Sequence, residues 1–432
     1  MKATDAVVAV DAPDDAPDVV ALGESMVTFL PSRPGRLADV PSFDRAIGGA
    51  ESNVACGLAA AGHAVRWVSR VGADGFGDHL VETVASYGVD VSYVDRDPVR
   101  PTGVYFRTAG DRATDAHEVA YYRAGSAASA MSVADVDLAA VRAGRILHLS
   151  GITAALSEGC LGLLHELTAA APAEGGRAVV SFDVNHRPGL WTGSGGAEVL
   201  LELARRADIV FVGEDEAELA WGVTGGPTAI REVLPEPEVL VVKQGAKGAT
   251  AFVSVAARWG LVAPTRRQPQ IEYSPAPLTG RFPAAPHQVT QLRAGVPQGG
   301  TGGRWGSPRS SEAESGGGTP QARASETPPP ADTHGTFEPA PTVDVVANVG
   351  AGDAFAAGFL SGILRGLPVR QTLRLGHLFA AAALTTPADL APPPARDTTD
   401  RLTGLDDAAW ERLRLGPGWT QAGVAEQEVR TP

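Results

Sequence analysis

The chain has 432 residues, of which 44% are hydrophobic and 20% charged, the composition of a soluble globular protein that can bury a large core. Its net charge of −14 repels phosphate backbones and anionic lipids, so we expect neither nucleic acid nor a membrane as a partner. No apolar run reaches the roughly 18 residues that a membrane-spanning helix needs. Two cysteines, Cys56 and Cys160, are too few for a disulfide framework and fit a reducing, cytoplasmic location.

Composition divides the chain into a folded core and segments predicted to be unstructured. Residues 266–342 contain 13 Pro and 11 Gly without apolar periodicity, and we predict that they form a disordered Pro/Gly-rich insertion. Residues 1–17 are predicted to be a flexible tail, without the basic-then-apolar order of a signal peptide. A second flexible tail is predicted at 416–432. The folded core is then expected to comprise 18–265 and 343–415.

Within this core, short β-branched runs alternate with helical patterns. The runs predicted to be strands are Val19–Leu22, Val65–Val71, Arg145–Leu149, Ala178–Asp183, Asp208–Val212 and Val239–Lys243. The stretches predicted to be helices are Glu51–Ala61, Asp78–Tyr87, Glu158–Ala171, Ala197–Ala204, Asp215–Gly222 and Thr228–Leu234. This alternation predicts an α/β fold with a mostly parallel sheet covered by helices on both faces, in which ligands bind at the carboxyl ends of the strands.

Two segments, about 27–47 and 100–124, break this alternation. The second contains GVYFRT and VAYYRA, which are typical of two alternating strands. Together the segments can form a small β-sheet beside the ligand site, where it would act as a lid that excludes water. An ordinary edge hairpin with tyrosines packed on it would give the same pattern.

The sharpest motif is a glycine-rich turn, NVGAGDAFAAGF, which starts at Asn348 and opens directly into an apolar helix. The backbone amides from Gly350 to Asp353 would converge at the positive end of that helix, an arrangement suited to phosphate. Asp353 would lie in the first turn, where an aspartate commonly does no more than stabilise the helix start. Beside a phosphate, it could instead take a proton from an attacking hydroxyl.

Two further glycine turns, IGGAESN and RVGADGFG, lie nearer the amino terminus. Paired glycines such as Gly48 and Gly49 let a ligand approach the backbone, and Asn53 can both donate to and accept from sugar hydroxyls. Three glycine turns on one α/β chain favour a site that holds two ligands. A Rossmann dinucleotide site is the rival interpretation, although GES rather than G-x-G-x-x-G follows the first strand and no P-loop motif occurs.

The stretch GGAESNVACGLAAAGHAVRWVSRVGADGFGDHL resembles the amino-terminal motif of the ribokinase-like (PfkB) carbohydrate kinases, and NVGAGDAFAAGFLSGIL resembles their carboxy-terminal motif. The likeness covers about residues 18–265 and 343–395, and two distant motifs in the right order make it specific. This resemblance implies a ribokinase-like three-layer α/β core with a small β-sheet lid. It also implies an enzyme that uses ATP and Mg²⁺ to phosphorylate a sugar hydroxyl.

The same resemblance implies roles for residues around the nucleotide. Asp353 matches the catalytic base of the family, and Gly350, Ala351 and Gly352 match its anion hole. Glu216 matches a glutamate associated with magnesium, although by itself it would more simply be an acid at a helix start. The residues expected to bind the nucleotide are Asn185, Lys243, Gly245, Lys247, Gly248 and His377. Without the companion motifs, the turn that holds both lysines would be interpreted as a solvated surface turn.

On the sugar side, YYRAGSAAS and DVNHRPGLW resemble the 2-keto-3-deoxygluconate kinases of this family. Arg107, Arg123 and Arg187 lie on the predicted lid or at a strand end, and guanidinium groups favour an acid sugar because they pair with a carboxylate. The implied substrate is therefore a small sugar acid whose 6-hydroxyl is phosphorylated, giving 2-keto-3-deoxy-6-phosphogluconate. The residues expected to contact it are Gly48, Gly49, Asn53, Tyr105, Tyr121, Arg123, Arg187 and Asp389. Ordinary solvated arginines are the alternative.

Other outcomes stay open. A kinase of a nucleoside or of a neutral sugar such as fructose or ribose would leave these arginines without a carboxylate partner. Ala347 and Asn348 replace the Asp-Thr pair common in the family, which puts potassium activation in doubt and keeps a catalytically inactive sugar-binding protein in view. Gly213 and His377 also depart from the usual residues near the nucleotide and would loosen ATP binding. The family resemblance further suggests a homo-oligomer formed through the lid.

Overall fold

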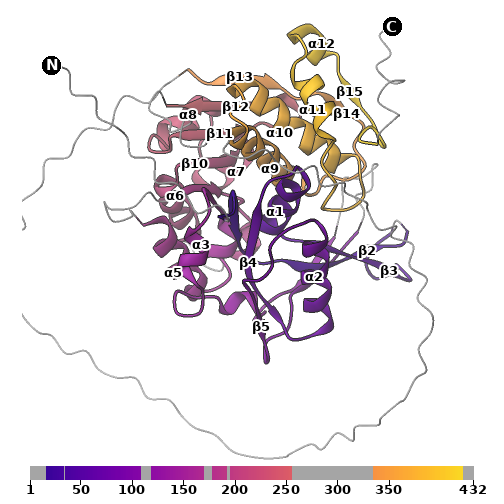
Figure 1. Ribbon diagram of the computed structural model, residues 1–432, viewed down its shortest axis with the longest axis vertical. Coiled ribbons are helices and arrows are strands. Elements are labelled where there is room, and N and C mark those ends of the chain that lie inside the picture. Colours follow the sequence, from indigo (N-terminus) through magenta and orange to yellow (C-terminus); the bar gives the residue numbers. More distant parts are fainter. Residues whose placement is uncertain are drawn as a thin grey trace, which may run out of the picture. The chain divides into compact units, whose positions relative to one another are not determined.

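The computed structural model describes residues 16–33, 35–108, 118–169, 178–191, 195–254 and 334–421. A nine-stranded sheet runs through them (Figure 1). From one edge to the other, its strands are β13 (Thr336–Pro339), β12 (Gly248–Val253), β11 (Val239–Lys243), β10 (Ile209–Gly213), β9 (Val179–Asp183), β8 (Ile146–Ser150), β1 (Val19–Leu22), β4 (Val65–Gly72) and β5 (Val94–Asp97). All pairings from β11 to β5 are parallel, whereas β12 runs antiparallel to both of its neighbours. The prediction of a mostly parallel sheet is confirmed.

Both faces of this sheet are covered by helices. Successive strand residues point to opposite faces, so that in β10 Ile209 and Phe211 enter one core while Val210 and Val212 enter the other. The helices that pack on the first core are α1 (Ala50–Ala60), α2 (Gly75–Ser86), α9 (Ala351–Leu364) and α10 (Val369–Leu384). Those on the second are α3 (Leu138–Arg142), α4 (Gly151–Ala154), α5 (Glu158–Thr168), α6 (Gly196–Arg206), α7 (Glu214–Trp221) and α8 (Gly226–Val233). The core is therefore a three-layer α/β structure.

A separate four-stranded sheet, which we call the lid sheet, contains β3 (Phe43–Gly48), β2 (Met26–Pro31), β6 (Val104–Arg107) and β7 (Val119–Tyr122) in that order (Figure 1). β2 pairs antiparallel with β3 and parallel with β6, and β6 pairs antiparallel with β7. Phe29 of β2 stacks on Phe106 of β6 with their ring centroids 4.7 Å apart. The prediction that the two irregular segments form one small sheet is confirmed.

The carboxy-terminal part of the described chain has a small apolar cluster of its own. Trp410 and Trp419 are buried there against Leu378 of α10. The elements that contribute to this region are α11 (Arg396–Thr403), α12 (Asp407–Glu411), and β14 (Thr342–Val343) paired in parallel with β15 (Arg414–Leu415). Other residues of α10 belong to the first core, so this cluster extends the helical layer that covers that core.

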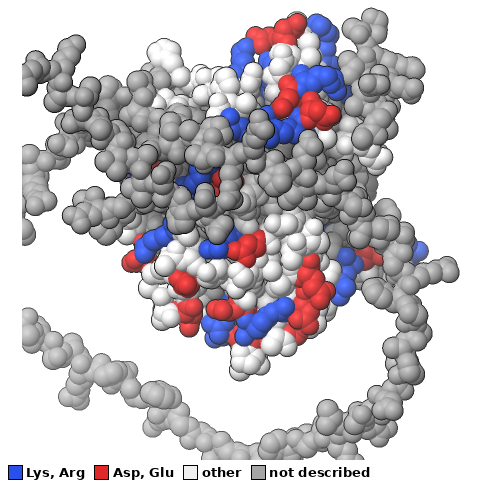
Figure 2. Space-filling model, viewed as in Figure 1, with Lys and Arg blue, Asp and Glu red and all other residues white. Residues whose placement is uncertain are grey.

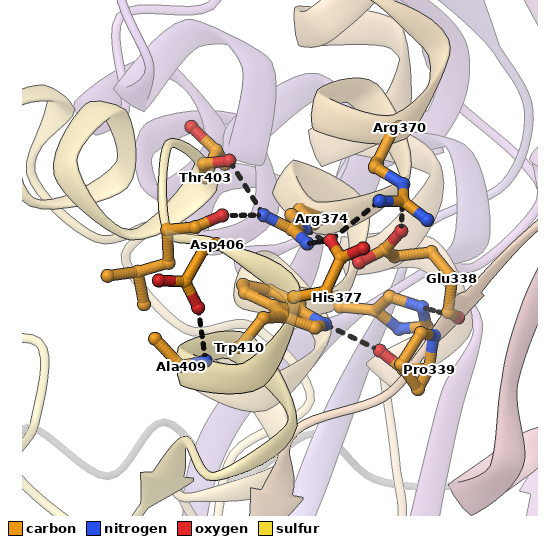
Figure 3. A network of polar contacts seen from close by, with 11 residues as sticks. Glu338, Pro339, Arg370, Arg374, His377, Thr403, Asp406, Ala409 and Trp410 are labelled. Carbon is orange, nitrogen blue, oxygen red and sulfur yellow. Dashed lines mark hydrogen bonds and ion pairs between the residues drawn. The ribbon is translucent and has the colours of Figure 1, made fainter.

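A polar network fixes this region to the edge strand β13 (Figure 3). Glu338 of β13 is only 1% exposed, and its two carboxylate oxygens lie 2.6 Å from Arg374 Nε and 3.0 Å from Arg370 Nε. Both arginines also contact Asp407, and the Arg374 guanidinium lies 4.9 Å from the Trp410 ring centroid. We call these five residues the Glu338 network.

The structure corrects two predicted domain limits. The predicted insertion at 266–342 extends too far, because Thr336–Pro339 forms β13 within the main sheet. Its sequence gave no strand signal, since the residue buried there is the charged Glu338 while Phe337 is 46% exposed. The predicted tail at 416–432 begins too early, because Trp419 is buried. The rest of the insertion, up to residue 333, and residues 1–15 and 422–432 lie outside the described residues.

The predicted elements recur with small shifts at their ends. The helix expected from Asp78 begins at Gly75, because Asp74 Oδ1 accepts hydrogen bonds from the amides of Phe76 and Gly77 and so caps the helix earlier. The helix expected to reach Ala171 ends at Thr168.

Acidic and basic side chains alternate over the described part of the face in Figure 2, so neither sign dominates there. None of the helices in the described ranges combines the length and the apolar character needed to cross a bilayer.

Candidate active site

The site is organised around the start of α9. Gly350 precedes this helix with φ 74°, a left-handed conformation that suits glycine. A Cβ at Gly350 would lie 1.9 Å from the backbone oxygen of Asp389, so any other residue would clash. The first amides of an α-helix have no partner within the helix, and here they belong to Ala351, Gly352 and Asp353. The predicted tight glycine turn into a helix start is present.

Asp353 meets the amino-terminal glycine motif at this point. Asn53 of α1 donates a hydrogen bond from Nδ2 to Asp353 Oδ2 at 2.9 Å, across 300 residues of sequence. Burial raises the pKa of Asp353 to about 7; the Asn53 hydrogen bond and the nearby Lys243 lower it, but not enough to cancel that effect. The carboxyl group can therefore change its protonation state near neutral pH.

Lys243, at the carboxyl end of β11, adds a positive charge beside the same helix. Its Nζ lies 3.6 Å from the position that a Cβ on Gly352 would occupy, and 3.0 and 3.1 Å from the two carboxylate oxygens of Asp183. Burial alone would lower the pKa of Lys243, but the Asp183 and Glu216 carboxylates outweigh it and raise the pKa. Lys243 therefore remains an ammonium ion beside the free amides of α9.

Glu216 lies in the first turn of α7, directly after β10. Its Oε2 accepts the Gly213 amide at 2.7 Å, and its Oε1 lies 3.8 Å from Arg187 Nη1. The sequence left open whether Glu216 caps a helix or serves the site, and the contacts include both a cap and an arginine. Gly213 allows this approach, since a Cβ there would lie 3.2 Å from the Glu216 side chain.

Asn185 follows β9 in a left-handed conformation, φ 41°, and is the one non-glycine residue with positive φ among those described. Its buried Oδ1 has no hydrogen-bond partner within the described chain. A strained residue with an unpaired buried acceptor is typical of a ligand site.

The other predicted nucleotide residues are more scattered. Gly245 and Gly248 both have positive φ in the turn between β11 and β12, whereas Lys247 extends outward and lies 3.6 Å from Glu214. His377 is buried on α10, where its Nε2 lies 3.1 Å from the Glu338 carbonyl oxygen. Burial lowers the pKa of His377 to about 4, so this neutral ring packs inside the protein.

On the sugar side, Gly48, Tyr105 and Asp389 meet. The Tyr105 hydroxyl donates to Asp389 Oδ2, and a Cβ on Gly48 would lie 2.0 Å from that hydroxyl. Gly49 is equally constrained, since a Cβ there would lie 2.5 Å from the Glu24 carbonyl oxygen. The predicted glycines therefore do permit close approach, but in this structure the groups that approach are protein atoms.

Arg123 and Tyr121 lie next to this group. The Arg123 guanidinium forms an ion pair with Glu24 Oε2 and lies 5.9 Å from the Tyr121 ring centroid. The Tyr121 ring is in turn 5.5 Å from that of Tyr105. Glu24 is also held by Ser126, whose hydroxyl donates to Oε1 at 2.5 Å.

Sequence reasoning did not select several buried carboxylates of the site, namely Glu24, Glu51 and Asp183. Glu51 is fully buried, accepts a hydrogen bond from the Thr153 hydroxyl at 2.6 Å, and has its pKa raised to about 8 by burial. All three are embedded in the motifs GES, GGAESN and DVNHR. The sequence signal that could have selected these three residues is an acidic residue inside a glycine-rich motif or a motif at the end of a strand.

These residues fit ATP on their own chemistry, because the unpaired amides at the start of α9 lie beside the ammonium group of Lys243, and both suit phosphate. Asn185, after β9, adds a buried amide oxygen without a hydrogen-bond partner in the described part of the chain. In the described ranges no group of three or more His, Cys, Asp or Glu side chains is arranged to hold a metal. Mg²⁺ commonly takes one or two carboxylates together with phosphate oxygens, so a single carboxylate such as Glu216 is compatible with it.

Curated proteins similar to this chain include 2-dehydro-3-deoxygluconokinases and fructokinases. The chain is 33% identical over 237 residues to the 2-dehydro-3-deoxygluconokinase of Thermoproteus tenax, covering 54% of this chain and 71% of that protein. It is 29% identical over 382 residues to the enzyme of the same name from Bacillus subtilis, covering 88% and 93%. It is also 32% identical over 243 residues to fructokinase-2 of Zea mays, covering 54% and 70%.

Solved structures agree with the fold. The PfkB protein of Polaromonas sp. JS666 superimposes with a TM-score of 0.62 at 28% identity, covering 89% of this chain and 99% of that one. A sugar kinase from Pyrococcus horikoshii in complex with ATP has the same fold, with a TM-score of 0.62 at 20% identity and coverage of 91% and 100%. The model of the pfkB family carbohydrate kinases matches residues 16–263 and 322–396, which is well over half of the chain. With its α/β core, its lid sheet and its glycine-opened helix at Asp353, the chain belongs to the PfkB family of carbohydrate kinases.

Proposed function

We propose that this sugar kinase phosphorylates the 6-hydroxyl of 2-keto-3-deoxygluconate, with ATP as donor and Mg²⁺ as its counter-ion. The observation that carries the proposal is the hydrogen bond from Asn53 to Asp353, because it joins the sugar-side motif to a carboxylate at a helix start suited to phosphate. The two relatives named 2-dehydro-3-deoxygluconokinase support this choice of sugar.

In the proposed reaction Asp353 takes the proton of the attacking hydroxyl as its oxygen forms a bond to phosphorus and the bond to the ADP oxygen breaks. Asn53 engages Oδ2, so Oδ1 is the oxygen that would receive the proton. A pKa of about 7 suits this role, because a general base works best when its pKa lies near the operating pH.

The groups around Asp353 would stabilise the charge that develops during transfer. The amides after Gly350 and the ammonium of Lys243 face one region, where they would hold phosphoryl oxygens. Bound ATP would supply the phosphoryl group and Mg²⁺ would neutralise part of its charge, with Glu216 as a candidate ligand. The lid sheet would exclude water, which otherwise competes with the sugar.

A neutral sugar is the second candidate, and one observation favours it. Arg107 and Arg123, on or beside the lid sheet, are already paired with Asp389 and Glu24. Arg187 has a longer contact, 3.8 Å to Glu216, and its side chain is 55% exposed, so it is the arginine best placed to receive a substrate carboxylate. The fructokinase relative is consistent with this second candidate.

The test is ADP release by purified protein with MgATP and, separately, 2-keto-3-deoxygluconate, fructose, ribose and adenosine. The proposal expects turnover confined to the keto-acid sugar. Turnover on fructose or ribose would sink this choice of substrate while leaving the kinase intact, and no turnover on any substrate would favour an inactive sugar-binding protein.

The substrate carboxylate is tested by Arg187→Met. Loss of a charged hydrogen-bond partner should raise KM for 2-keto-3-deoxygluconate by about 10-fold or more with a smaller change in kcat. Arg205→Met, which removes an exposed arginine from the end of α6, is the matched control and should leave KM unchanged. An unchanged KM in Arg187→Met would show that Arg187 does not bind the carboxylate.

A further inference from the structure

Arg107 forms a buried ion pair between two regions that are far apart in the sequence. It ends strand β6 of the lid sheet, and its Nη2 lies 2.5 Å from Asp389 Oδ1 and 2.7 Å from the Pro387 carbonyl oxygen. Both side chains are 5% exposed. Removing one partner of a buried ion pair leaves an uncompensated buried charge, so loss of Arg107 should weaken the contact between the lid strand and the loop after α10.

The same strand also occupies the other oxygen of Asp389. Tyr105, two residues before Arg107, donates its hydroxyl to Asp389 Oδ2. Both carboxylate oxygens are therefore engaged by one lid strand. The position of the loop at Asp389 is set by the position of β6.

The backbone of Asp389 contacts the start of α9. Its carbonyl oxygen lies where a Cβ on Gly350 would come within 1.9 Å, and Gly350 is the residue whose left-handed turn opens the helix. The next residues carry the amides suited to phosphate and the Asp353 carboxylate. A displaced Asp389 would therefore release the glycine turn against which it packs.

We propose that Arg107 is a positioning residue that holds the helix start of α9 in place through Asp389, so that lid sheet and anion hole are positioned together. The catalytic meaning of this coupling rests on the proposed kinase reaction. The coupling itself is a property of the fold. Its consequence is that phosphoryl transfer is efficient only with the lid strand seated, which limits transfer to water.

This inference gives Asp389 a different role from the direct sugar contact expected from the sequence. A sugar ligand should have a carboxylate oxygen available. Asp389 Oδ2 accepts the Tyr105 hydroxyl, and Oδ1 lies 2.5 Å from Arg107 Nη2 in an ion pair without hydrogen-bond geometry. The two roles predict different effects of replacing Arg107. A positioning role predicts faster exchange at the start of α9, and a sugar contact by Asp389 does not.

The experiment compares Arg107→Met, Asp389→Asn and the double variant in the full chain. Its first readout is amide hydrogen exchange of the peptide from Gly350 to Ala357, in which the Ala354 amide donates to the Gly350 carbonyl and starts the hydrogen-bonded part of α9. This readout requires neither sugar nor ATP. We expect each single variant to raise exchange in this peptide by about 10-fold, because local opening becomes easier, and the double variant to add little. Arg107→Lys, which keeps the charge, should recover part of the protection.

The second readout is the ratio of ADP released to sugar phosphate formed, measured with whichever sugar the wild type phosphorylates. The ratio should rise above one in the variants, and kcat should fall by about 10- to 100-fold, since small misplacements at a reacting centre have effects of this size. Arg66→Met is the matched control, because it breaks the Arg66–Asp90 pair, which has an Nε to Oδ2 distance of 2.8 Å and lies outside the lid sheet and α9. It should leave unchanged both the exchange of the peptide that begins at Gly350 and the ratio of ADP to sugar phosphate.

Two results would overturn the proposal. Faster exchange confined to β6, with the Gly350 peptide unchanged, would show that the ion pair does not hold the helix start. If Asp389→Asn raises KM while Arg107→Met changes neither exchange nor kinetics, Asp389 is a sugar ligand and not a link to β6. Should the Arg107 and Asp389 variants not fold, Tyr105→Phe removes only one hydroxyl and is expected to change exchange in the same direction. Failure of the proposed substrate leaves the exchange result intact, so the two failures are distinguishable.

Discussion

The Glu338 network and the residues around Asp353 are built from the same kinds of side chain but differ in how completely they are paired. In the first, both oxygens of Glu338 face arginines, and Arg374 also donates to the carbonyls of Thr403 and Leu405 (Figure 3). Around Asp353, the buried oxygens Asn53 Oδ1 and Asn185 Oδ1 have no hydrogen-bond partner in the described part of the chain.

This difference separates structural polar groups from functional ones. A buried network in which each charge faces an opposite charge holds elements together, even though Glu338 Oε2 has an ion pair and no hydrogen bond. Buried polar groups that have neither kind of partner cost free energy and persist where a ligand completes them. The pKa values point the same way, since burial brings the pKa of Asp353 to about 7 and leaves it poised near neutral pH. The Glu338 network should therefore govern stability, and the Asp353 group should govern turnover.

The largest expected effect is that of Asp353→Asn on turnover. Loss of the proposed general base should lower kcat by about 10²- to 10⁴-fold, measured as ADP release under saturating substrate. The fold should survive, because the substitution removes a carboxylate that burial disfavours. Asp95→Asn changes an exposed aspartate on β5 and is the control. A variant with wild-type kcat would contradict the assignment of Asp353.

Arg374→Met should have the opposite profile. It leaves Glu338 buried with one half-exposed arginine and removes the donor to two carbonyls, so we expect the free energy of unfolding to fall by about 3 to 5 kcal/mol. Urea titration would measure this, and kcat of the folded fraction should change little. Arg206→Met, which breaks an exposed pair with Glu202, should cost at most about 1 kcal/mol. If Arg374→Met lowered kcat without lowering the free energy of unfolding, the Glu338 network would have a functional role and not a structural one.

The pH dependence of kcat/KM should reflect the raised pKa of Asp353. A base must be ionised to accept a proton, so activity should fall about tenfold per pH unit below pH 7 and level off above it. A profile flat down to pH 5 would show that Asp353 keeps an ordinary pKa.

The raised pKa of Asp353 should also affect stability, but here the free energy of unfolding falls as pH rises, whereas activity increases. A carboxyl whose pKa is raised by folding binds its proton more tightly in the native state, so its stabilising effect is lost as pH rises towards and through about 7. Asp353→Asn should therefore be more stable than the wild type at pH 8, by about 1 to 3 kcal/mol. Thermal or urea unfolding of both proteins at pH 5 and pH 8 would measure the difference.

The smallest expected effect is that of Glu51→Gln. Burial raises the pKa of Glu51 to about 8, so at pH 5 the group is protonated in the native state and still partly protonated in the unfolded chain. A neutral amide of similar shape should therefore change the free energy of unfolding by less than about 1 kcal/mol at pH 5. Between pH 5 and pH 8 the wild type should lose stability relative to the variant, because the native state keeps a proton that the unfolded chain has released, and the difference should level off above pH 8. Urea unfolding at pH 5, 7 and 9 tests this, and a large loss of stability in the variant at pH 5 would mean that Glu51 is ionised and paired.

Much of the site was predictable because its motifs lie at chain positions with strong local signals. The glycines before α1 and α9 must permit close contacts, and both GGAESN and NVGAGD mark helix starts in the sequence. Tyr105 and Asp389 were selected too, but their mutual hydrogen bond was not, because no local pattern links residues 284 positions apart.

The sequence by itself determined the alternation of strands and helices, the glycine turns and the family, since each of these depends on periodicity or on residues close together in the chain. Only the tertiary structure decided that Asn53 meets Asp353, that Arg107 pairs with Asp389, and that Glu338 belongs to the sheet. These outcomes depend on which groups are desolvated together, and that is fixed when distant segments pack against one another.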